Sequence, residues 1–535
     1  MAPHIIRIAI VGFGPRGLGA LEALLREAEP RKQSLAIELF DPAPWPAAGP
    51  NFSPDESEVC LLNLPLRAID LPPPVTDAPS SFPDWVRPQG YDDEAFVPRA
   101  LLGQYLNMRY AELAASLPAE VTLSHHAVQV TSASRDGGWH LHSGTSDYGP
   151  YDHVLLSVGQ PETADDDQMA EWRDHAARHG LDLAHAYPGH ALIAAADAWA
   201  GKTVAIRGLG LSALDVVGLL TQGLGGRFED QRYIASGREP ARIVPFSLDG
   251  HAPAPKPATA EIDARFDPLP AEDAAFRDAL TTALVGPPDK ALTTICTALE
   301  APTLRILGET DPSAVRHWLQ TERDEPGTQE TRDTTATLRA HIAQAEGDTP
   351  SIGYTIGQLW RKWQPLLREG YLAAPVGPQT ATALTDFDEG LKRYSYGAPV
   401  ATLRHLLTLI ETGLVDPRAA DAPDITATAQ GWRLHEDDTT LTAAIMIDSV
   451  LPAAALPPVS DPLIEALKTT HLTALADDLG ARTTPEGAAT TPEGTRIKGL
   501  WLAGRLANGS VIAADSIHDC FGIVPRRWAR AVLAP

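Results

Sequence analysis

The clearest hydrophobic pattern lies near the N-terminus, where two apolar runs enclose a glycine-rich turn and an amphipathic segment. Residues 8–41 (IAIVGFGPRGLGALEALLREAEPRKQSLAIELFD) predict a strand, a turn, a helix, a second strand and a final acid, in that order. Gly12 permits the tight turn, Gly14 lets a pyrophosphate approach the backbone, and Gly17 lets the helix pack on the strand. Asp41, about 20 residues further on, is placed to accept hydrogen bonds from a ribose. The pattern therefore predicts a dinucleotide-binding βαβ unit.

A second copy of the pattern occurs further along the chain, in residues 202–217 (KTVAIRGLGLSALDVV). It again predicts an apolar strand, then Gly208, Gly210 and Ala213 in the Gly-x-Gly-x-x-Ala form, then a helix whose first turn carries Ser212. Two such units suggest two dinucleotides, and one enzyme class that needs both is the flavoprotein that takes hydride from a nicotinamide. The first unit would then hold FAD, and Gly208, Gly210 and Ser212 would bind NAD(P)H. The alternative is that the second turn is only structural.

Composition agrees with a large multidomain enzyme. At 535 residues the chain exceeds what one core usually supports, so two or three domains are expected. The net charge of −26 and the pI near 5.0 oppose binding to nucleic acid or to anionic membranes. No run of about 18 apolar residues occurs, and the first strand begins almost at once, so we expect a cytoplasmic location. The cysteines are widely separated, which argues against a redox disulfide, a zinc site or an iron–sulfur cluster.

The remaining apolar runs indicate that the first domain is split. Residues 153–162 (HVLLSVGQPE) predict a strand at which the chain leaves this domain, and residues 498–522 (KGLWLAGRLANGSVIAADSIHDCFG) predict another. In two-dinucleotide flavoproteins the last strand of the FAD sheet comes from the C-terminus, which makes Gly504 and Asp519 cofactor-binding candidates. We therefore expect an α/β fold with two Rossmann-like dinucleotide-binding domains. The predicted parts are 1–165 and 435–535 for the FAD domain, 166–250 for the NADPH domain, and 251–434 for a mainly helical insert.

Two segments of the first domain carry polar residues on the predicted approach to the cofactor. Residues 96–110 (FVPRALLGQYLNMRY) predict a loop leading into a helix, with Arg99 and Tyr105 as cofactor-binding candidates. The alternative is an ordinary amphipathic helix with a surface arginine. In residues 60–71 (CLLNLPLRAIDL), Asn63 lies between apolar residues in the region near the isoalloxazine, and it is a candidate catalytic residue. An asparagine that caps the core is the alternative there.

The choice of nicotinamide cofactor depends on residues 233–240 (YIASGREP). We interpret this segment as the second strand of the second βαβ unit, with Arg238 at its end. An arginine in that position can pair with an adenosine 2′-phosphate. The sequence therefore favours NADPH over NADH, unless Arg238 is a solvated loop residue.

Several of these segments together resemble one bacterial family. They are IAIVGFGPRGLGALEALL, CLLNLP, PRALLGQYL, SVGQP, GLGLSALD with SGREP, and LKRYSYGAPV (391–400). Spread over most of the chain, they are similar to the bacterial FAD/NAD(P)-binding proteins whose best-understood members are flavin-dependent aspartate N-monooxygenases, the nitrosuccinate synthases. Residues 250–350 carry little that matches this family, and we expect substrate choice to lie there.

The resemblance implies an FAD- and NADPH-dependent monooxygenase that uses O2 and an amino-acid substrate. In such enzymes NADPH reduces FAD, the reduced flavin adds O2 at C4a, and the hydroperoxide transfers an oxygen to a nucleophilic nitrogen. The site must exclude water and must bind the neutral amine, because an ammonium group is not nucleophilic. By this resemblance the chain would N-hydroxylate L-aspartate and oxidise it onward to nitrosuccinate. It would act without nucleic acid or membrane, and a homodimer is the assembly expected from general frequency.

An aspartate substrate brings two carboxylates, and each needs a cationic partner when it leaves water. The loop after the second unit carries candidates, because ligands of open α/β sheets lie beyond the carboxyl ends of the strands. Arg265 and Lys256 are candidate carboxylate-binding residues, and His251 is a candidate catalytic residue near the amine. Arg393 is a further candidate, although its aromatic neighbours also suit a packed structural arginine. For each of the loop residues the alternative is a solvated charge.

Two other functions remain open from the sequence. A flavin monooxygenase for another amine, a thiol or a carbonyl would use the same cofactors, although the Phe-x-Gly-x-x-x-His-x-x-x-Trp pattern of Baeyer–Villiger enzymes does not occur in the chain. A non-enzymatic dinucleotide-binding scaffold is the second alternative, and the two intact glycine motifs count against it.

Overall fold

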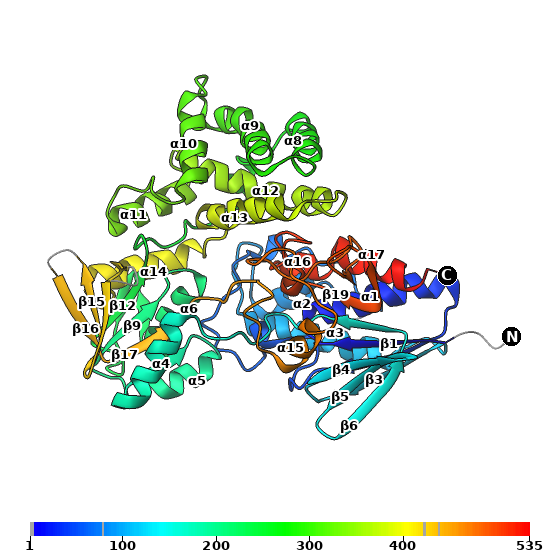
Figure 1. Cartoon of the computed structure of the whole chain (residues 1–535). Helices are drawn as coiled ribbons and strands as arrows, with labels where there is room; N and C mark the ends of the chain where they lie inside the picture. The colour runs from blue at the N-terminus through cyan, green and yellow to red at the C-terminus, as the bar shows by residue number, and fades with distance from the viewer. Residues whose placement is uncertain (1–4, 77–79, 421–423, 437–438, 535) are drawn as a thin grey trace.

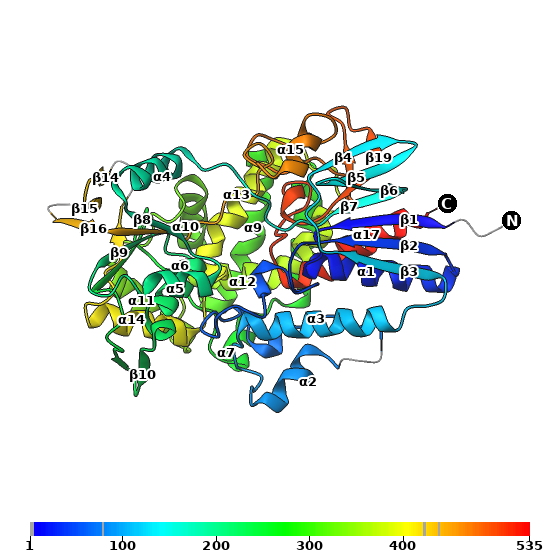
Figure 2. The same cartoon turned by 90° about the horizontal axis from the view of Figure 1, so that it is seen from below.

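The computed structural model describes residues 5–76, 80–420, 424–436 and 439–534. Two parallel β-sheets lie at opposite ends of the molecule, and a layer of helices packs over the region between them (Figure 1). Strand β1 (Ile6–Val11) and helix α17 (Ile523–Val532), near the two ends of the chain, both belong to the first sheet and its cover (Figure 2). The chain therefore leaves the first domain and returns to it.

The first sheet has the order β18-β19-β7-β1-β2-β3, and its strands pair in parallel except for β18 with β19. Ile8 and Ile10 of β1 pack on one face, and Ala9 packs on the other. A strand buried on both faces explains the continuous apolar run in the sequence. The other strands are β2 (Leu35–Phe40), β3 (Val121–His126), β7 (His153–Leu156), β18 (Ala488–Thr490) and β19 (Arg496–Leu502).

Helices and a small antiparallel sheet complete the first domain. Helix α1 (Pro15–Ala28) packs against α17 over the first sheet, and α3 (Arg99–Ala115) runs beside them (Figure 2). The antiparallel sheet is made of β4 (Ser132–Asp136), β5 (Gly138–Ser143) and β6 (Ser146–Tyr151). The short helices are α2 (Phe82–Val86), α15 (Pro462–Lys468) and α16 (Ile517–Cys520). The C-terminal origin of β19 confirms the predicted split domain.

The second sheet has the order β13-β12-β9-β17-β8, and all its strands are parallel. The strands are β8 (Asp182–His185), β9 (Thr203–Arg207), β12 (Arg242–Ser247), β13 (Arg418–Ala419) and β17 (Ile445–Asp448). Its helices are α4 (Asp167–His179), α5 (Gly189–Ala196) and α6 (Leu211–Thr221). A second antiparallel sheet contains β14 (Ile425–Thr428), β15 (Gly431–Glu436) and β16 (Thr439–Ala443). Each parallel sheet is thus accompanied by a three-stranded antiparallel one.

Two sequence-based expectations for the second domain need correction. The return to the first domain was expected at residue 435, but β17 pairs with β9, so the second domain extends to Asp448. Residues 233–240 are not the second strand of the βαβ unit, because β10 (Arg227–Glu229) and β11 (Arg232–Ile234) form a separate hairpin. The parallel partner of β9 is β12. Both differences concern strand pairing over long distances, which local hydrophobic patterns do not encode.

The helical layer spans residues 260–411 within the predicted insert. Its helices are α7 (Ala260–Ala264), α8 (Pro270–Ala283), α9 (Pro288–Leu307), α10 (Ser313–Asp324), α11 (Thr334–Ala345), α12 (Ile352–Tyr371), α13 (Pro378–Ser395) and α14 (Val400–Glu411). Trp360 and Trp363 of α12 are buried among α8, α9 and α13, so the opposite side of α12 is left to face the two domains. Among the described residues, no helix is long and apolar enough to cross a membrane.

Candidate functional site

A cleft of about 1170 Å³ lies where the two domains and the helical layer meet. The carboxyl ends of strands from both parallel sheets open into it, which is where open α/β sheets bind ligands. Helices α12 and α14 form a further wall, and the C-terminal segment 514–518 forms another. The cleft is therefore lined by both domains, by the helical layer and by the C-terminal segment.

The first glycine turn follows β1 and has the geometry that its sequence predicts. Gly12 has φ +82°, and a Cβ atom there would lie 2.7 Å from the carbonyl oxygen of Ser157. A Cβ atom on Gly17 would lie 2.8 Å from the carbonyl oxygen of Gly12. Gly14 begins α1 without a side-chain cap and lines the cleft, so the first N–H groups of the helix face it. Only glycine fits at positions 12 and 17, whereas Gly14 leaves room for a ligand.

Asp41 lies directly after β2 and also lines the cleft. Its Oδ2 accepts the backbone N–H of Phe13 at 2.6 Å, and its Oδ1 accepts the N–H of Ala43 at 2.8 Å. A carboxylate has about four lone-pair positions, so both oxygens can still accept hydroxyl groups. Its predicted role as a ribose acceptor is consistent with this geometry.

The C-terminal segment is bound to the first glycine turn by a buried ion pair. Arg16 Nη1 lies 2.6 Å from Asp519 Oδ2, and Arg16 Nη2 donates to the carbonyl of Ala514 at 2.6 Å. Gly504 has φ +84°, and a Cβ atom there would lie 2.5 Å from Arg16 Nε. Gly504 and Asp519 were predicted to bind the cofactor themselves. They instead surround Arg16, which lines the cleft and which the sequence analysis did not single out.

The second glycine turn has the same backbone form as the first, with fewer protein atoms around the start of its helix. Gly208 has φ +101°, and a Cβ atom there would meet Ser449 Oγ at 2.8 Å. Gly210 begins α6 without a side-chain cap, and nothing among the described residues lies within 4 Å of its Cβ position. Ser212, in the first turn of α6, lines the cleft, and Gly208 and Gly210 are not among its lining residues.

The backbone shows which residue of the second unit corresponds to Asp41. The N–H of Gly12 donates to the carbonyl of Phe40, just before Asp41, and the N–H of Gly208 donates to the carbonyl of Phe246. Ser247 therefore stands at the position of Asp41. Ser247 itself carries no charge, and its Oγ donates to Asp249 Oδ1 at 2.9 Å, so the nearest carboxylate lies one side chain further away than in the first unit.

The predicted role of Arg238 must be corrected. Arg238 precedes β12 rather than following it. The backbone carbonyl of the next residue, Glu239, accepts the N–H of Gly201, just before the amino end of β9. Its guanidinium forms an exposed ion pair with Asp197. Arg238 therefore lies at the edge of the sheet opposite the carboxyl ends, where the 2′-phosphate of a dinucleotide would not reach it.

The candidates of the first domain are divided between cleft and core. Asn63 lines the cleft. Arg99 also lines it, and its guanidinium pairs with Asp215 of α6, which joins the two domains. Tyr105 does not reach the cleft, because its hydroxyl donates to the carbonyl of Ser80 at 3.0 Å and its ring packs beside Phe82. Its predicted contact with the cofactor is therefore not supported.

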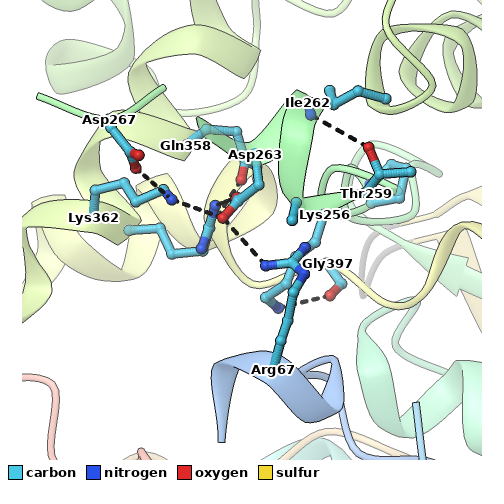
Figure 3. Close-up of polar contacts among 12 residues, drawn as sticks. Arg67, Lys256, Thr259, Ile262, Asp263, Asp267, Gln358, Lys362 and Gly397 are labelled. Carbon is cyan, nitrogen blue, oxygen red and sulfur yellow. Dashed lines mark hydrogen bonds and ion pairs between the residues drawn. The ribbon is translucent and has the colours of Figure 1, made fainter. Parts of the chain in front are cut away.

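A cluster of charged side chains lies where α7, α12 and the first domain meet (Figure 3). Asp263 is its centre: Lys362 Nζ lies 2.7 Å away, Arg67 Nη1 lies 3.5 Å away, and Arg361 makes a closer ion pair. Burial alone would raise the pKa of the Asp263 carboxyl, but Arg361 and Lys362 lower it below its ordinary value. The neighbouring cations therefore favour the ionised form of Asp263.

Lys256 lies beside this cluster and lines the cleft. Its side chain is 5% exposed, and Nζ donates to the carbonyl of Gly397 at 2.9 Å. Burial, and then the charge of Arg361, lower the pKa of Lys256 from 10.5 to about 7. Of the residues predicted to bind substrate, Lys256 is the one that the structure brings to the cleft.

The other predicted substrate residues lie outside the cleft. Arg265 Nη1 donates to the carbonyl of Gly347 at 2.8 Å. Arg393 Nη1 lies 2.6 Å from Asp249 Oδ2. The same carboxylate, through Oδ1, accepts the backbone N–H of His251 at 3.1 Å. These three residues therefore serve contacts within the second domain and helical layer, and their predicted roles at the substrate are not supported.

Helix α12 supplies functional candidates that the sequence analysis missed. Arg361, Pro365 and Arg368 line the cleft and recur at a spacing that puts them on one helix face. The tryptophans at 360 and 363 mark the buried face, so this amphipathic pattern could have revealed the exposed cations. It could not have revealed that the exposed face meets a cleft rather than solvent.

The residues present fit two dinucleotides. In the first turn, Gly14 gives backbone access beside the uncapped start of α1, and Asp41 offers a carboxylate at the end of β2. In the second, the space at the Cβ position of Gly210 is empty of described atoms. Free helix N–H groups and a nearby carboxylate are the donors and acceptors that a pyrophosphate and a ribose require.

Comparison with known proteins agrees with this geometry. Residues 9–161 match a family model described as FAD-NAD(P)-binding. The nitrosuccinic acid synthase of Aspergillus oryzae is 31% identical over 270 residues, which are 45% of this chain and 41% of that protein. An L-aspartate N-monooxygenase (nitrosuccinate-forming) of Streptomyces davaonensis is 27% identical over 296 residues, 45% of this chain and 44% of that protein. The match thus spans less than half the length of these curated relatives.

Solved structures show the same fold over almost the whole chain. Ornithine hydroxylase (PvdA) from Pseudomonas aeruginosa matches with a TM-score of 0.50 and 12% identity, covering 99% of both chains. The cadaverine monooxygenase DfoA from Erwinia amylovora, bound to FAD, matches with a TM-score of 0.51 and 12% identity, covering 99% of this chain and 95% of that one. Residues 9–161 thus match an FAD-NAD(P)-binding family model, within a chain whose fold is similar to that of these two proteins.

Proposed function

We propose that this protein is an FAD- and NADPH-dependent monooxygenase that N-hydroxylates L-aspartate and oxidises the product onward to nitrosuccinate. The observation that carries the proposal is the cleft that residues of both dinucleotide-binding units line. The choice of substrate is supported by the names of the relatives, which specify nitrosuccinate or aspartate N-oxidation. Extending their activity to the whole of this chain is part of the proposal.

The first domain would hold FAD and the second NADPH. Gly14 and the start of α1 would receive the FAD pyrophosphate, Asp41 would accept its ribose hydroxyls, and Asn63 would lie near the reactive end. Ser212 and the start of α6 would receive NADPH. When bound, NADPH supplies electrons to FAD, and reduced FAD activates O2.

The contact between the domains would limit access of water. Arg99 of α3 pairs with Asp215 of α6, and the hydroxyl of Tyr187 donates to the same carboxylate. These groups line the cleft and join its two sides. A closed site from which water is excluded slows the loss of activated oxygen before it reaches the substrate. This bridge would therefore raise the fraction of NADPH oxidation that yields product.

The charges of the cleft suit an acidic amine better than a basic one. The chain carries a net charge of −26, yet Lys256 and Arg368 line one wall of the cleft without a carboxylate partner among the described residues, next to Arg361 and Lys362, which pair with Asp263. A substrate with two carboxylates would be attracted to that wall, whereas a diamine would be repelled. This contrast favours L-aspartate over ornithine or cadaverine.

The test is NADPH oxidation by the purified, FAD-loaded protein in air with single amino acids. We expect L-aspartate to stimulate oxidation above the rate without substrate, and mass spectrometry to detect nitrosuccinate. Stimulation by a different amine, thiol or carbonyl compound but not by aspartate would contradict the substrate while retaining the flavin monooxygenase class. A protein that retains no FAD would contradict the class as well.

Two further expectations accompany the proposal. A homodimer is expected on general frequency, and light scattering of the purified protein tests it. A cytoplasmic location is expected from the sequence, and cell fractionation tests it.

A further inference from the structure

Most cationic side chains that line the cleft are already paired with carboxylates. Asp263, which is 8% exposed, holds two of them together with a third from the first domain. The pairs are Arg16 with Asp519, Arg99 with Asp215, and Arg361 and Lys362 with Asp263. A cation that is already paired with a carboxylate attracts an incoming anion less strongly than an unpaired one does.

Three other cations of the cleft, Lys256, Arg368 and Arg505, have no such partner in the part of the chain that the structure describes. Arg505 donates to Gln160 Oε1 and to the carbonyl of Pro452, whereas Lys256 and Arg368 are less occupied. Among the described residues, neither has a carboxylate within ion-pair distance, and each makes one hydrogen bond to the protein. Lys256 Nζ donates to the carbonyl of Gly397 at 2.9 Å, and Arg368 Nε donates to the carbonyl of Ala513 at 3.0 Å. An ammonium group has three donors and a guanidinium has five, so both side chains retain unused donors at the cleft.

The two side chains belong to the same wall. Lys256 Nζ lies 5.8 Å from the centre of the Tyr396 ring, and the Tyr396 hydroxyl donates to Asp515 at 3.3 Å, close to Ala513, which accepts from Arg368. Lys256 lies beside Arg361 of α12. Arg361 and Arg368 are seven residues apart on this helix, which is about 10 Å along its axis. Long side chains at that separation can reach the two ends of one small molecule.

We infer that Lys256 and Arg368 bind the two carboxylates of a four-carbon dicarboxylate, and so select the substrate at this site. The inference rests on the proposed function for the identity of the site as a substrate site. Lys256 binds one carboxylate and Arg368 the other, while Asp263 holds Arg361 and Lys362 in the wall behind them. A monocarboxylate meets only one partner, and a diamine meets two repelling charges.

The test measures binding rather than turnover, using succinate, a dicarboxylate without an amino group. Isothermal titration calorimetry on the FAD-loaded protein should detect succinate, with butyrate at least about 10-fold weaker because it lacks one charge-assisted contact. Lys256→Met and Arg368→Met should each weaken succinate about 10- to 100-fold, to the level of butyrate. The matched controls are Lys290→Met and Arg277→Met, at exposed positions on α9 and α8, and they should bind succinate as the wild type does.

The pH dependence distinguishes the two cations. Lys256 is faced by Arg361 from α12, Asp263 from α7 and the ring of Tyr396, and its pKa is about 7. Succinate affinity should therefore fall as the pH rises through 7, because Lys256 loses its charge. This fall should persist in Arg368→Met and disappear in Lys256→Met.

The outcomes separate this inference from the proposed function. Unchanged succinate binding in both variants, or no succinate binding in the wild type, overturns the inference even if aspartate is oxidised. Succinate binding that both variants weaken supports it even if aspartate is not a substrate. If Lys256→Met loses its FAD or fails to fold, Arg368→Lys decides: retained charge should preserve part of the selectivity for succinate over butyrate, and loss of all selectivity with intact binding would contradict the inference.

Discussion

The two glycine turns share a motif but differ in how the protein surrounds them. A Cβ atom on Gly14 would lie 3.4 Å from Gly49, and the adjacent Arg16 is bound to the C-terminal segment through Asp519. The Cβ position of Gly210 has no described atom within 4 Å. The first turn is closed by distant segments, whereas the second is open. This is the difference expected between a cofactor that stays bound and one that exchanges in every cycle.

The acceptor positions differ in the same sense. Asp41 ends β2 of the first unit, and Ser247 occupies the matching position of the second. The first offers a carboxylate to ribose hydroxyls, whereas the second offers a neutral hydroxyl, which is bonded to Asp249. One motif has therefore been adapted to two cofactors by its surroundings, and substitutions in those surroundings can test each half of the comparison.

Removing the bond that closes the first turn should have the largest effect. Asp519→Ala leaves Arg16 buried without its carboxylate, which typically costs about 3–5 kcal/mol. We expect most FAD to be lost on purification and the flavin-release temperature of the remainder to fall. Flavin fluorescence during heating measures both. The control is Asp84→Ala, which removes an exposed partner of Arg87 and should cost less than about 1 kcal/mol. Equal effects of the two variants would refute the role of Asp519 in closing the first turn.

Adding one methyl group to each turn should affect the two turns unequally. Gly14→Ala places Cβ 3.4 Å from Gly49 at the start of α1, where the FAD pyrophosphate would approach, so it should lower the FAD content. Gly210→Ala adds Cβ to open space at φ −82° and should preserve the fold and FAD content. Absorbance at the flavin band per mole of protein distinguishes them. FAD loss in both variants would mean that the second turn is as closed as the first.

Giving the second unit the acid of the first should change cofactor preference. Ser247→Asp places a carboxylate where we expect the 2′-phosphate, so the KM for NADPH should rise about 10- to 100-fold and the KM for NADH far less. Steady-state oxidation of the two cofactors measures this, with Ser247→Ala as the neutral control. If both KM values change by the same factor, Ser247 does not face the phosphate.

Arg238 should have the smallest effect. Its ion pair with Asp197 is about half exposed on both sides, and such pairs contribute about 0–1 kcal/mol. Arg238→Ala should therefore leave the KM values for NADPH and NADH within about twofold of the wild type. A selective rise for NADPH would restore the role that the sequence first suggested.

The sequence predicted the parts of the fold that depend on local chemistry. The turns at Gly12 and Gly208 were predictable because positive φ angles and close backbone contacts demand glycine. The return of β19 to the first sheet was predictable by analogy with the flavoprotein architecture. The pairing of β9 with β12 and β17 was not, because a short hairpin and a long helical insert separate these strands in sequence.

The candidate site was less predictable than the fold. Asp41, Asn63, Arg99 and Lys256 line the cleft, whereas Arg265 and Arg393 bond within the helical layer and second domain. A charged residue on a loop can turn toward either side, and the sequence does not say which. Arg361 and Arg368 escaped notice because a helix shows its polar face in the sequence without showing what that face meets.

Lys256 is itself a primary amine, so it serves as an internal example of how the cleft treats such a group. Burial, and then the charge of Arg361, bring its pKa from 10.5 to about 7. A substrate amine held at the same wall meets the same burial and the same guanidinium, and its protonated form is destabilised in the same way. The environment that would bind an acid would thereby also favour the neutral form of its amine.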